Sequence, residues 1–248
     1  MVISGVLTAA GLVACAFFVK EEKAKVRVLK IFALLTVAIH YSDLWVSFFE
    51  TGEADIADSH LLPIYPCNII MWMLLITAFL KNRDTLPAKM LTDFVFWAGI
   101  VCGSIGIIFN ENFGNNPTLA EWDILDGLLS HSTMLFGCIY LGVGKFMRIR
   151  VDNLPGIVCG LLFFVLDGAI INGLFSVFHL DPVNSMYLLH PPFATMPWLT
   201  TPVMGLAGVA LAFGISALYE QISLPREQRW YVRLKEFIEQ RKEQHQER

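Results

Sequence analysis

Seven stretches of apolar residues constrain the fold of this chain more than any other feature of its sequence. Each has roughly 16 to 25 residues, and a helix of that length, rising 1.5 Å per residue, crosses a hydrocarbon core of about 30 Å. Only 16% of the 248 residues are charged and 55% are hydrophobic, whereas a soluble chain has about 25% charged residues. The sequence therefore predicts an all-α, polytopic membrane protein and excludes a soluble enzyme, a disordered chain and a disulfide-stapled secreted domain. The seven predicted transmembrane helices cover residues 2–19, 28–49, 63–80, 92–109, 125–144, 154–178 and 198–219.

The positive charges predict the orientation of these helices. All 18 Lys and Arg residues fall in four segments, 20–30, 81–89, 145–150 and 226–248. In a seven-span arrangement these segments lie on one side of the membrane, and the opposite loops, 50–62, 110–124 and 179–197, contain no Lys or Arg. Because basic loops stay in the cytoplasm, we expect an outside N-terminus, a cytoplasmic C-terminus and a multi-pass protein of the cell membrane.

Two regions are predicted along the chain. Residues 1–222 form the seven-helix transmembrane domain, and residues 223–248 form a cytoplasmic, charged, amphipathic tail helix that lies on the membrane surface. The five cysteines have no paired spacing, so neither a disulfide framework nor a zinc ribbon is indicated. We expect no cofactor and no bound metal, and the net charge of -4 makes nucleic acid an unexpected partner.

Polar residues in the spans gather at one depth. Counting from the outer ends of their helices, Asp43, His131 and Asn172 lie about 9 Å deep, His40 about 13 Å and Cys67 about 6 Å. His40 and Asp43, three residues apart, are expected to share one helix face. Ionisable residues in a membrane usually face the bundle interior or a water-filled cavity. The sequence therefore predicts a polar pocket that opens outward.

Cys67 has the most distinctive setting of the five cysteines. It follows Pro66 and falls in the first turn of the third span, where unpaired backbone N–H groups and the helix dipole favour a nucleophilic thiolate. His131 is expected at a similar depth, and it can act as base and later as acid. Spacing alone leaves two other interpretations open, a packing cysteine and a histidine that only bonds two helices together. The candidates to orient the imidazole are His40, Asp43, Asn172 and Asn184.

The outer loop from Asp181 to Pro197 is moderately apolar and rich in proline, and it carries Asn184, Tyr187 and His190. It is too short and too broken by proline to span a membrane. We expect either a lid that folds back over the pocket or an ordinary surface loop.

Three short motifs, taken in order, resemble those of a known family. They are Pro63–Asn68, His131–Thr133, and Asn184–Leu188 with the following Pro191. This set is similar to that of the YwaF-type bacterial integral membrane proteins, whose eukaryotic relative is transmembrane protein 164. The resemblance implies an acyltransferase that moves fatty acyl groups between phospholipids and lysophospholipids through an acyl-cysteine. By this resemblance Cys67 would be the nucleophile and His131 its base, with Asn184 and Tyr187 near the site.

Other functions remain open from the sequence. Hydrolysis in place of transfer would make the protein a lipase-like acyl hydrolase. A zinc-dependent hydrolase would use His40, Asp43, His131 and His190, although no His-x-x-x-His pair is present. A transporter or receptor would use the same outward pocket for binding alone.

Overall fold

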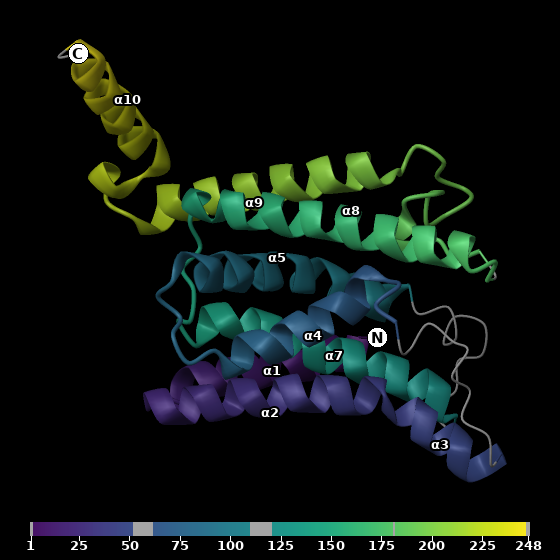
Figure 1. The fold of residues 1–248 in the computed structure, drawn as a ribbon. Coiled ribbons are helices and arrows are strands. Elements are labelled where there is room, and N and C mark those ends of the chain that lie inside the picture. Colours follow the sequence, from purple (N-terminus) through teal and green to yellow (C-terminus); the bar gives the residue numbers. More distant parts are fainter. Residues whose placement is uncertain (1, 52–61, 110–120, 181, 247–248) are drawn as a thin grey trace.

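The computed structural model describes residues 2–51, 62–109, 121–180 and 182–246, and in these residues the regular structure is entirely helical, with no strand. Figure 1 shows the helices packed side by side with alternating direction, and the C-terminal helix standing apart from the bundle. The α-helices are α1 (Val2–Phe18), α2 (Glu22–His40), α3 (Ser42–Thr51), α4 (Pro66–Phe79), α5 (Leu86–Ile108), α7 (Trp122–Val143), α8 (Leu154–Val177), α9 (Thr201–Ser223) and α10 (Trp230–Gln246). Short 3-10 helices are η1 (Val151–Asn153), η2 (Ser185–Tyr187) and η3 (Arg226–Gln228).

Four helical segments are long and apolar enough to cross a membrane, namely Leu86–Ile108, Ile124–Val143, Val151–Val177 and Thr201–Ser223. They coincide with the predicted spans that begin at residues 92, 125, 154 and 198. The helices at the first and third predicted spans, Ile3–Phe18 and Pro66–Phe79, are apolar but shorter. The chain is therefore an all-helical membrane protein.

Proline marks the start of several helices. A proline stands at the first or second position of α4, α5, α8 and α9. The first turn of a helix needs no backbone donor, and the fixed φ of proline already suits it. The same rule, applied to Pro66, predicts from sequence where α4 begins.

The predicted continuous helix over residues 28–49 is wrong at one point, because the chain breaks between α2 and α3. The Ser42 hydroxyl donates to the carbonyl oxygen of Ile39 at 2.5 Å, an oxygen that the N–H of Asp43 would take in an unbroken helix. Trp122 of α7 donates to the same hydroxyl at 3.0 Å. His40 and Asp43 therefore belong to different helices, and the expected shared face of one helix is not found.

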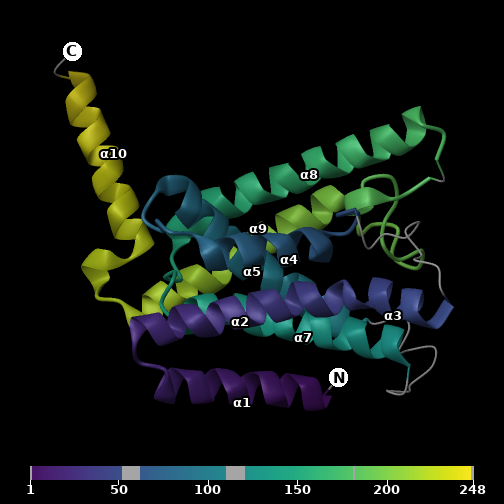
Figure 2. The ribbon, with the colours of Figure 1, turned by 60° about the horizontal axis from the view of Figure 1, so that its bottom comes forward.

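The centre of the bundle is the pair α5 and α7, which make the most extensive helix contact. α5 also packs on α4 and α8, and α7 packs on α1 and α2. Figure 2 shows α1 on the outside of this arrangement, and α1 packs on α7. α9 packs on α8 and buries few residues, so its surface is mostly available to lipid.

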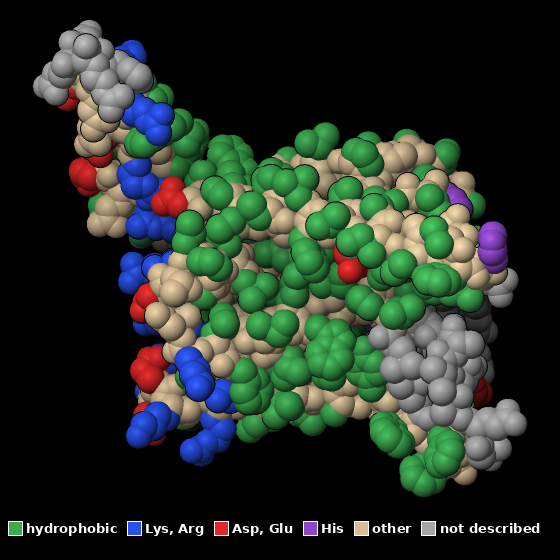
Figure 3. Space-filling model, viewed as in Figure 1, with side chains coloured by type: hydrophobic (Ala, Val, Ile, Leu, Met, Phe, Trp, Pro, Cys, Tyr) green, Lys and Arg blue, Asp and Glu red, His purple; other side chains and the backbone are tan. Residues whose placement is uncertain are grey.

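Basic side chains gather at one end of the molecule. Figure 3 shows Lys and Arg at the end where α10 joins the bundle, while the long flank between the two ends is covered by hydrophobic side chains. The connections at residues 19–21, 80–85 and 144–153 lie at this end. The segregation of charge predicted from the sequence is therefore present in the folded chain.

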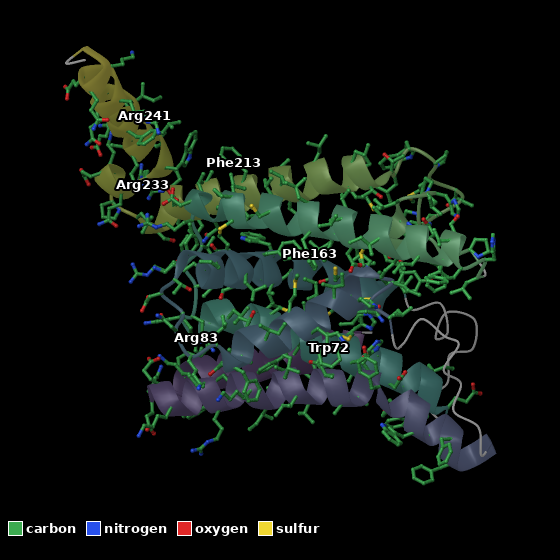
Figure 4. All side chains as sticks on the ribbon, in the orientation of Figure 1. Trp72, Arg83, Phe163, Phe213, Arg233 and Arg241 are labelled. Atoms are coloured by element: carbon green, nitrogen blue, oxygen red, sulfur yellow. The ribbon has the colours of Figure 1, made fainter. Side chains whose placement is uncertain are left out.

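A buried carboxylate holds α10 at this basic end. Glu220, the last charged residue of α9, is 0% exposed. It accepts hydrogen bonds from the backbone N–H of Val151 at 2.9 Å, from that of Trp230 at 2.5 Å and from the Arg233 guanidinium at 3.2 Å. Arg233, labelled in Figure 4 at the base of α10, also donates to Asp152 at 2.9 Å. One side chain thus joins η1, which precedes α8, to the end of α9 and the start of α10.

We predict that Glu220→Ala releases α10 from the bundle. The substitution leaves the N–H groups of Val151 and Trp230 without their acceptor, and each buried unsatisfied group costs about 1–3 kcal/mol. Trypsin should then cut the purified protein faster after Arg229 and Arg233. The matched control is Glu227→Ala, which removes an exposed carboxylate of η3 and should leave the cleavage rate unchanged. Equal cleavage of both variants would contradict the role given to Glu220.

Candidate functional site

Cys67 lies in the first turn of α4. Tyr65 precedes the helix with an extended backbone, Pro66 opens it, and the N–H groups of Cys67 and Asn68 lie close to the Cys67 sulfur. This arrangement matches the predicted position of the thiol among helix-end donors. The residue is also partly buried, and burial disfavours a charge. Activation of this thiol therefore needs a neighbouring base in addition to the helix terminus.

Asn68 connects Cys67 to the end of α2. Its side chain is 3% exposed, and its Nδ2 lies 3.0 Å from Nε2 of His40. The Cys67 thiol donates to Asn68 Oδ1 at 3.4 Å. Next to this contact, Trp72 of α4, labelled in Figure 4, donates to the Tyr41 hydroxyl at 2.8 Å. Two contacts therefore join the residues at the break between α2 and α3 to α4. One is the contact of His40 with Asn68, which also accepts from the Cys67 thiol, and the other is the hydrogen bond between Tyr41 and Trp72.

The imidazole of His131 is fixed by its own helix. Nδ1 lies 2.7 Å from the carbonyl oxygen of Gly127, one turn earlier in α7. A carbonyl oxygen can only accept, so Nδ1 carries the proton and Nε2 has the lone pair that a general base requires. The group that orients this imidazole is thus the backbone carbonyl of Gly127. From the sequence, only side chains were candidates for this role.

α5 lies between His131 and Cys67. The Cδ2–Nε2 edge of the His131 ring rests on Gly106, where a Cβ would overlap it. One turn earlier on α5, Cys102 is near enough to Cys67 for electrostatic interaction between the two thiols. Cys102 and Gly106, four residues apart, share one face of α5 and are separated by about 6 Å along its axis. The His131 ring therefore rests one turn beyond Cys102 on this face of α5, and Cys67 and His131 share no direct hydrogen bond.

The contact that brings α7 to this position is built on glycine. A Cβ at Gly99 would overlap the Cys138 thiol, and one at Gly103 would lie 2.9 Å from the Cβ of Leu135. Together with Gly106, these glycines form a smooth track on α5 into which α7 inserts its side chains. Small residues at helix contacts are the usual means by which membrane helices approach closely.

Three consecutive residues of α7 face three different neighbours. His131 points to α5, the Ser132 hydroxyl pairs with that of Ser4 in α1 at 2.5 Å, and Thr36 of α2 donates to the Thr133 hydroxyl at 3.1 Å. Successive helical residues are turned by about 100°, so three residues in a row point to three different neighbouring helices. This segment of α7, which includes His131, therefore contacts α1, α2 and α5.

The outer loop folds back onto the segment before Cys67. Residues 182–188, here called the return loop, place Ser185 and Met186 in the interior. The backbone N–H of Met186 and the Ser185 hydroxyl both donate to the carbonyl oxygen of Ile64, at 2.9 and 3.0 Å. Asn172 of α8 binds both backbone groups of Ser185. The fold-back expected of a lid is present, and it rests three residues before the candidate nucleophile.

The sharp reversal of the return loop depends on unusual backbone angles. Met186 and Tyr187 both have positive φ, 52° and 55°, a region that costs energy for any residue with a side chain. The side-chain amide of Asn184 fixes the following turn through the N–H of Leu189 and both backbone groups of His190. The ring of Tyr187 lies against that of Tyr65, with centroids 5.8 Å apart.

The predicted residues thus fall into two groups. Cys67, His40 and His131 lie at the same end of the bundle around α4 and α5, whereas Asn172 and Asn184 bind backbone and shape the return loop. Asp43 lies in α3, and its side chain is outside the described part of the molecule. Among the residues that the structure describes, no group of three or more His, Cys, Asp or Glu side chains is placed to hold a metal ion.

Sequence reasoning did not single out three participants, namely Asn68, Gly106 and Gly127. Asn68 carried a usable signal, because an amide inside an apolar helix needs a partner. The spacing of Gly103 and Gly106 indicates close helix packing, but it does not say which side chain fills the space. The carbonyl of Gly127 has no sequence signal, since every residue carries one.

A family model described as the TMEM164 family matches residues 1–219. No curated protein and no solved structure matched the chain. The matched stretch includes Cys67 and His131 and ends within α9, before the tail helix. The predicted relation to transmembrane protein 164 is confirmed, and the relation to YwaF-type proteins stays a prediction.

We predict that Gly106→Ala displaces the His131 ring. The added methyl group occupies the space of Cδ2 and Nε2, and overpacking of this kind costs about 1–3 kcal/mol. The midpoint of thermal unfolding should fall, and diethyl pyrocarbonate should modify His131 faster, as read by mass spectrometry. Gly208→Ala in α9 is the matched control, because a Cβ there meets nothing within 4 Å. An unchanged His131 reaction rate in Gly106→Ala would contradict the packing described here.

Proposed function

The chain belongs to the TMEM164 family, and from this premise we propose that it is a membrane-embedded phospholipid acyltransferase. In this proposal the protein is a multi-pass protein of the cell membrane, and it transfers a fatty acyl group from a phospholipid to a lysophospholipid. The acyl group passes through a thioester on Cys67. Where water replaces the acceptor lipid, the same site acts as a lipase-like hydrolase.

The proposed topology has seven spans, with the N-terminus outside and the C-terminus in the cytoplasm. The four long apolar helices, the apolar α1 and α4, and the alternating direction of the helices in Figure 1 support this arrangement. The gathering of Lys and Arg at the end next to α10 supports the orientation, since basic loops remain in the cytoplasm. Cys67 then lies near the outer surface, at the level of ester groups in the outer leaflet.

The observation that carries the proposal is the setting of one thiol. Cys67 combines a helix N-terminus with two nearby backbone N–H groups, and it interacts electrostatically with Cys102, one turn of α5 before the glycine on which the His131 imidazole rests. A thiol nucleophile, a base with a fixed tautomer and donors for an oxyanion are the parts that acyl transfer requires. None of the other cysteines lies in the first turn of a helix.

The first half-reaction acylates the enzyme. Nε2 of His131 accepts the Cys67 proton as the sulfur attacks the ester carbonyl carbon of the donor phospholipid. Backbone N–H groups at the start of α4 stabilise the oxyanion that forms. The ester C–O bond then breaks, the lysophospholipid oxygen takes the proton from His131, and Cys67 keeps the acyl group as a thioester.

The second half-reaction runs through the same groups. His131 accepts the proton of an acceptor hydroxyl, whose oxygen attacks the thioester carbonyl carbon. The C–S bond breaks, and the sulfur recovers the proton from His131. The return loop next to Ile64 and the hydrophobic flank of the bundle restrict water around the thioester, which favours a lysophospholipid acceptor over hydrolysis.

We predict a trapped acyl adduct on Cys67 when the purified protein is incubated with phospholipid alone. Intact-mass and peptide mass spectrometry should show one acyl chain that hydroxylamine removes, because thioesters are labile to that reagent. Cys67→Ala should abolish both the adduct and acyl exchange to lysophospholipid. His131→Ala should lower exchange by about 100-fold or more, the typical contribution of general acid–base catalysis.

Cys159→Ala is the control for these variants, because Cys159 is an exposed cysteine of α8. It should keep both the adduct and wild-type exchange. Full exchange activity in Cys67→Ala and His131→Ala would remove the proposed mechanism.

A further inference from the structure

The C-terminal helix α10 carries an apolar face that remains half exposed. Because successive helical residues turn by about 100°, Trp230 and four further apolar side chains fall within about 120° of the helix circumference. These four have between 38% and 52% of their surface exposed, and they are Tyr231, Leu234, Phe237 and Ile238. Figures 1 and 2 agree that α10 leaves the bundle at its basic end and runs across the direction of the bundle helices. This face is therefore available to a partner outside the bundle.

The start of α10 lies at the level of the last turn of α9. The Trp230 N–H donates to the Glu220 carboxylate at 2.5 Å, and Glu220 precedes the end of α9 by three residues, or about 5 Å along the axis. The Trp230 ring also packs against Phe213 of α9, with centroids 5.4 Å apart. Phe213, labelled in Figure 4, belongs to the segment Thr201–Ser223, which can cross a membrane and buries little of its surface. The face that starts with Trp230 therefore continues the lipid-facing side of α9.

The charged residues of α10 are sorted around this face. Glutamates lie on the opposite side of the helix, whereas lysine or arginine lies along both edges of the apolar face. The glutamates are Glu236, Glu239 and Glu243, and the cations at the edges are Lys235, Lys242 and Arg233. This order suits a helix in the headgroup layer of a membrane, because its apolar side chains enter the acyl region, its edge cations lie level with the phosphates and its carboxylates face water.

Two lysines on one edge are placed to bind lipid headgroups. Lys242 is exposed, and Lys235 makes an exposed ion pair with Glu239 at 3.8 Å. Such a pair contributes little to stability, so a lipid phosphate can replace it. Arg233, on the other edge, is already bound to Glu220 and fixes the base of the helix instead.

Arg241 distinguishes a lipid surface from a protein interface. It falls within the apolar face, near the end of α10, and its guanidinium lies 5.0 Å from the centroid of the Phe237 ring. A dry protein interface would bury this charge at high cost. At a membrane surface, the apolar stem of the side chain can lie along the ring while the charge reaches the headgroups. This position therefore favours a lipid surface as the partner of α10.

We propose that α10 lies in the headgroup layer of the leaflet at the basic end of the bundle, and that it binds anionic phospholipids there. The sequence predicts a tail helix on the membrane surface; the proposal adds which side chains enter the leaflet and which ones select the lipid. Leu234, Phe237 and Ile238 enter the acyl region, and Lys235 and Lys242 bind the phosphates. The inference goes beyond acyl transfer and does not depend on it, and its test needs no turnover.

The test follows α10 in the full-length protein by hydrogen–deuterium exchange and mass spectrometry. The protein is reconstituted in nanodiscs of phosphatidylcholine alone and in nanodiscs of phosphatidylcholine mixed with phosphatidylglycerol. The backbone amides from Leu234 to Gln244 should exchange more slowly in the mixed nanodiscs, because binding suppresses local opening. Each lysine near an anionic surface strengthens binding about fivefold, so the slowing should be about 5-fold to 25-fold. High salt should remove most of it.

Two double variants separate the contributions of charge and of apolar contact. Every substitution is to glutamine, which is a good helix former. Lys235→Gln with Lys242→Gln should make the exchange rates equal in the two kinds of nanodisc. Leu234→Gln with Ile238→Gln should speed exchange in both, because the apolar side chains that enter the leaflet are lost.

Glu236→Gln with Glu243→Gln is the matched control, since it makes the same kind of change on the side that faces water. It should keep the slowing or increase it. The proposal is overturned if wild-type α10 exchanges equally fast in both kinds of nanodisc, the result expected of a face that binds a protein partner. It is overturned as well if the lysine variant keeps the full slowing, or if the control variant loses it to the same extent.

Discussion

The close approach of α5 and α7 is the constraint on which the arrangement of the site depends. Three glycines of α5, at positions 99, 103 and 106, leave no room for a Cβ beside α7. The two backbones can therefore lie close together, and the side chains of α7 fill the track in register. The His131 ring lies against Gly106, the last of these three glycines. The contact that packs α7 on α5 therefore also positions the imidazole. Cys102, on the same face of α5, interacts electrostatically with Cys67 of α4.

The two ends of the bundle use polar groups in different ways. At the basic end, the Glu220 carboxylate is satisfied by two backbone donors and one guanidinium, which suits a fixed joint between η1, α9 and α10. At the other end, the Asn68 amide contacts both His40 and the Cys67 thiol, while the His131 imidazole is held by the Gly127 carbonyl oxygen. The fixed joint therefore lies at the cytoplasmic side of the proposed topology, and the proposed chemistry lies at the outer side.

Much of the fold follows from the sequence, because the membrane imposes few solutions. Apolar length and proline position predict most helix bounds within a few residues, and charge predicts which loops share one end. The break at Tyr41 was not predictable in this way, since it depends on the Ser42 hydroxyl and its contact with Trp122, eighty residues away. The sequence predicted a similar depth for Cys67 and His131, but it did not predict that the His131 ring rests on Gly106 of α5. The hydrogen bonds of Asn172 and Asn184 were not predictable either, because these amides bind backbone groups of a loop whose path the sequence does not specify.

The most direct measurement is the distance between Cys67 Sγ and His131 Nε2 in an experimentally determined structure with a bound phospholipid analogue. The account predicts that the two atoms lie within hydrogen-bonding distance of each other or of the ester carbonyl between them. It predicts as well that His131 Nδ1 keeps its bond to the Gly127 carbonyl. A bound ester that lies against Cys67 with the imidazole still separated from it by a turn of α5 would contradict the account.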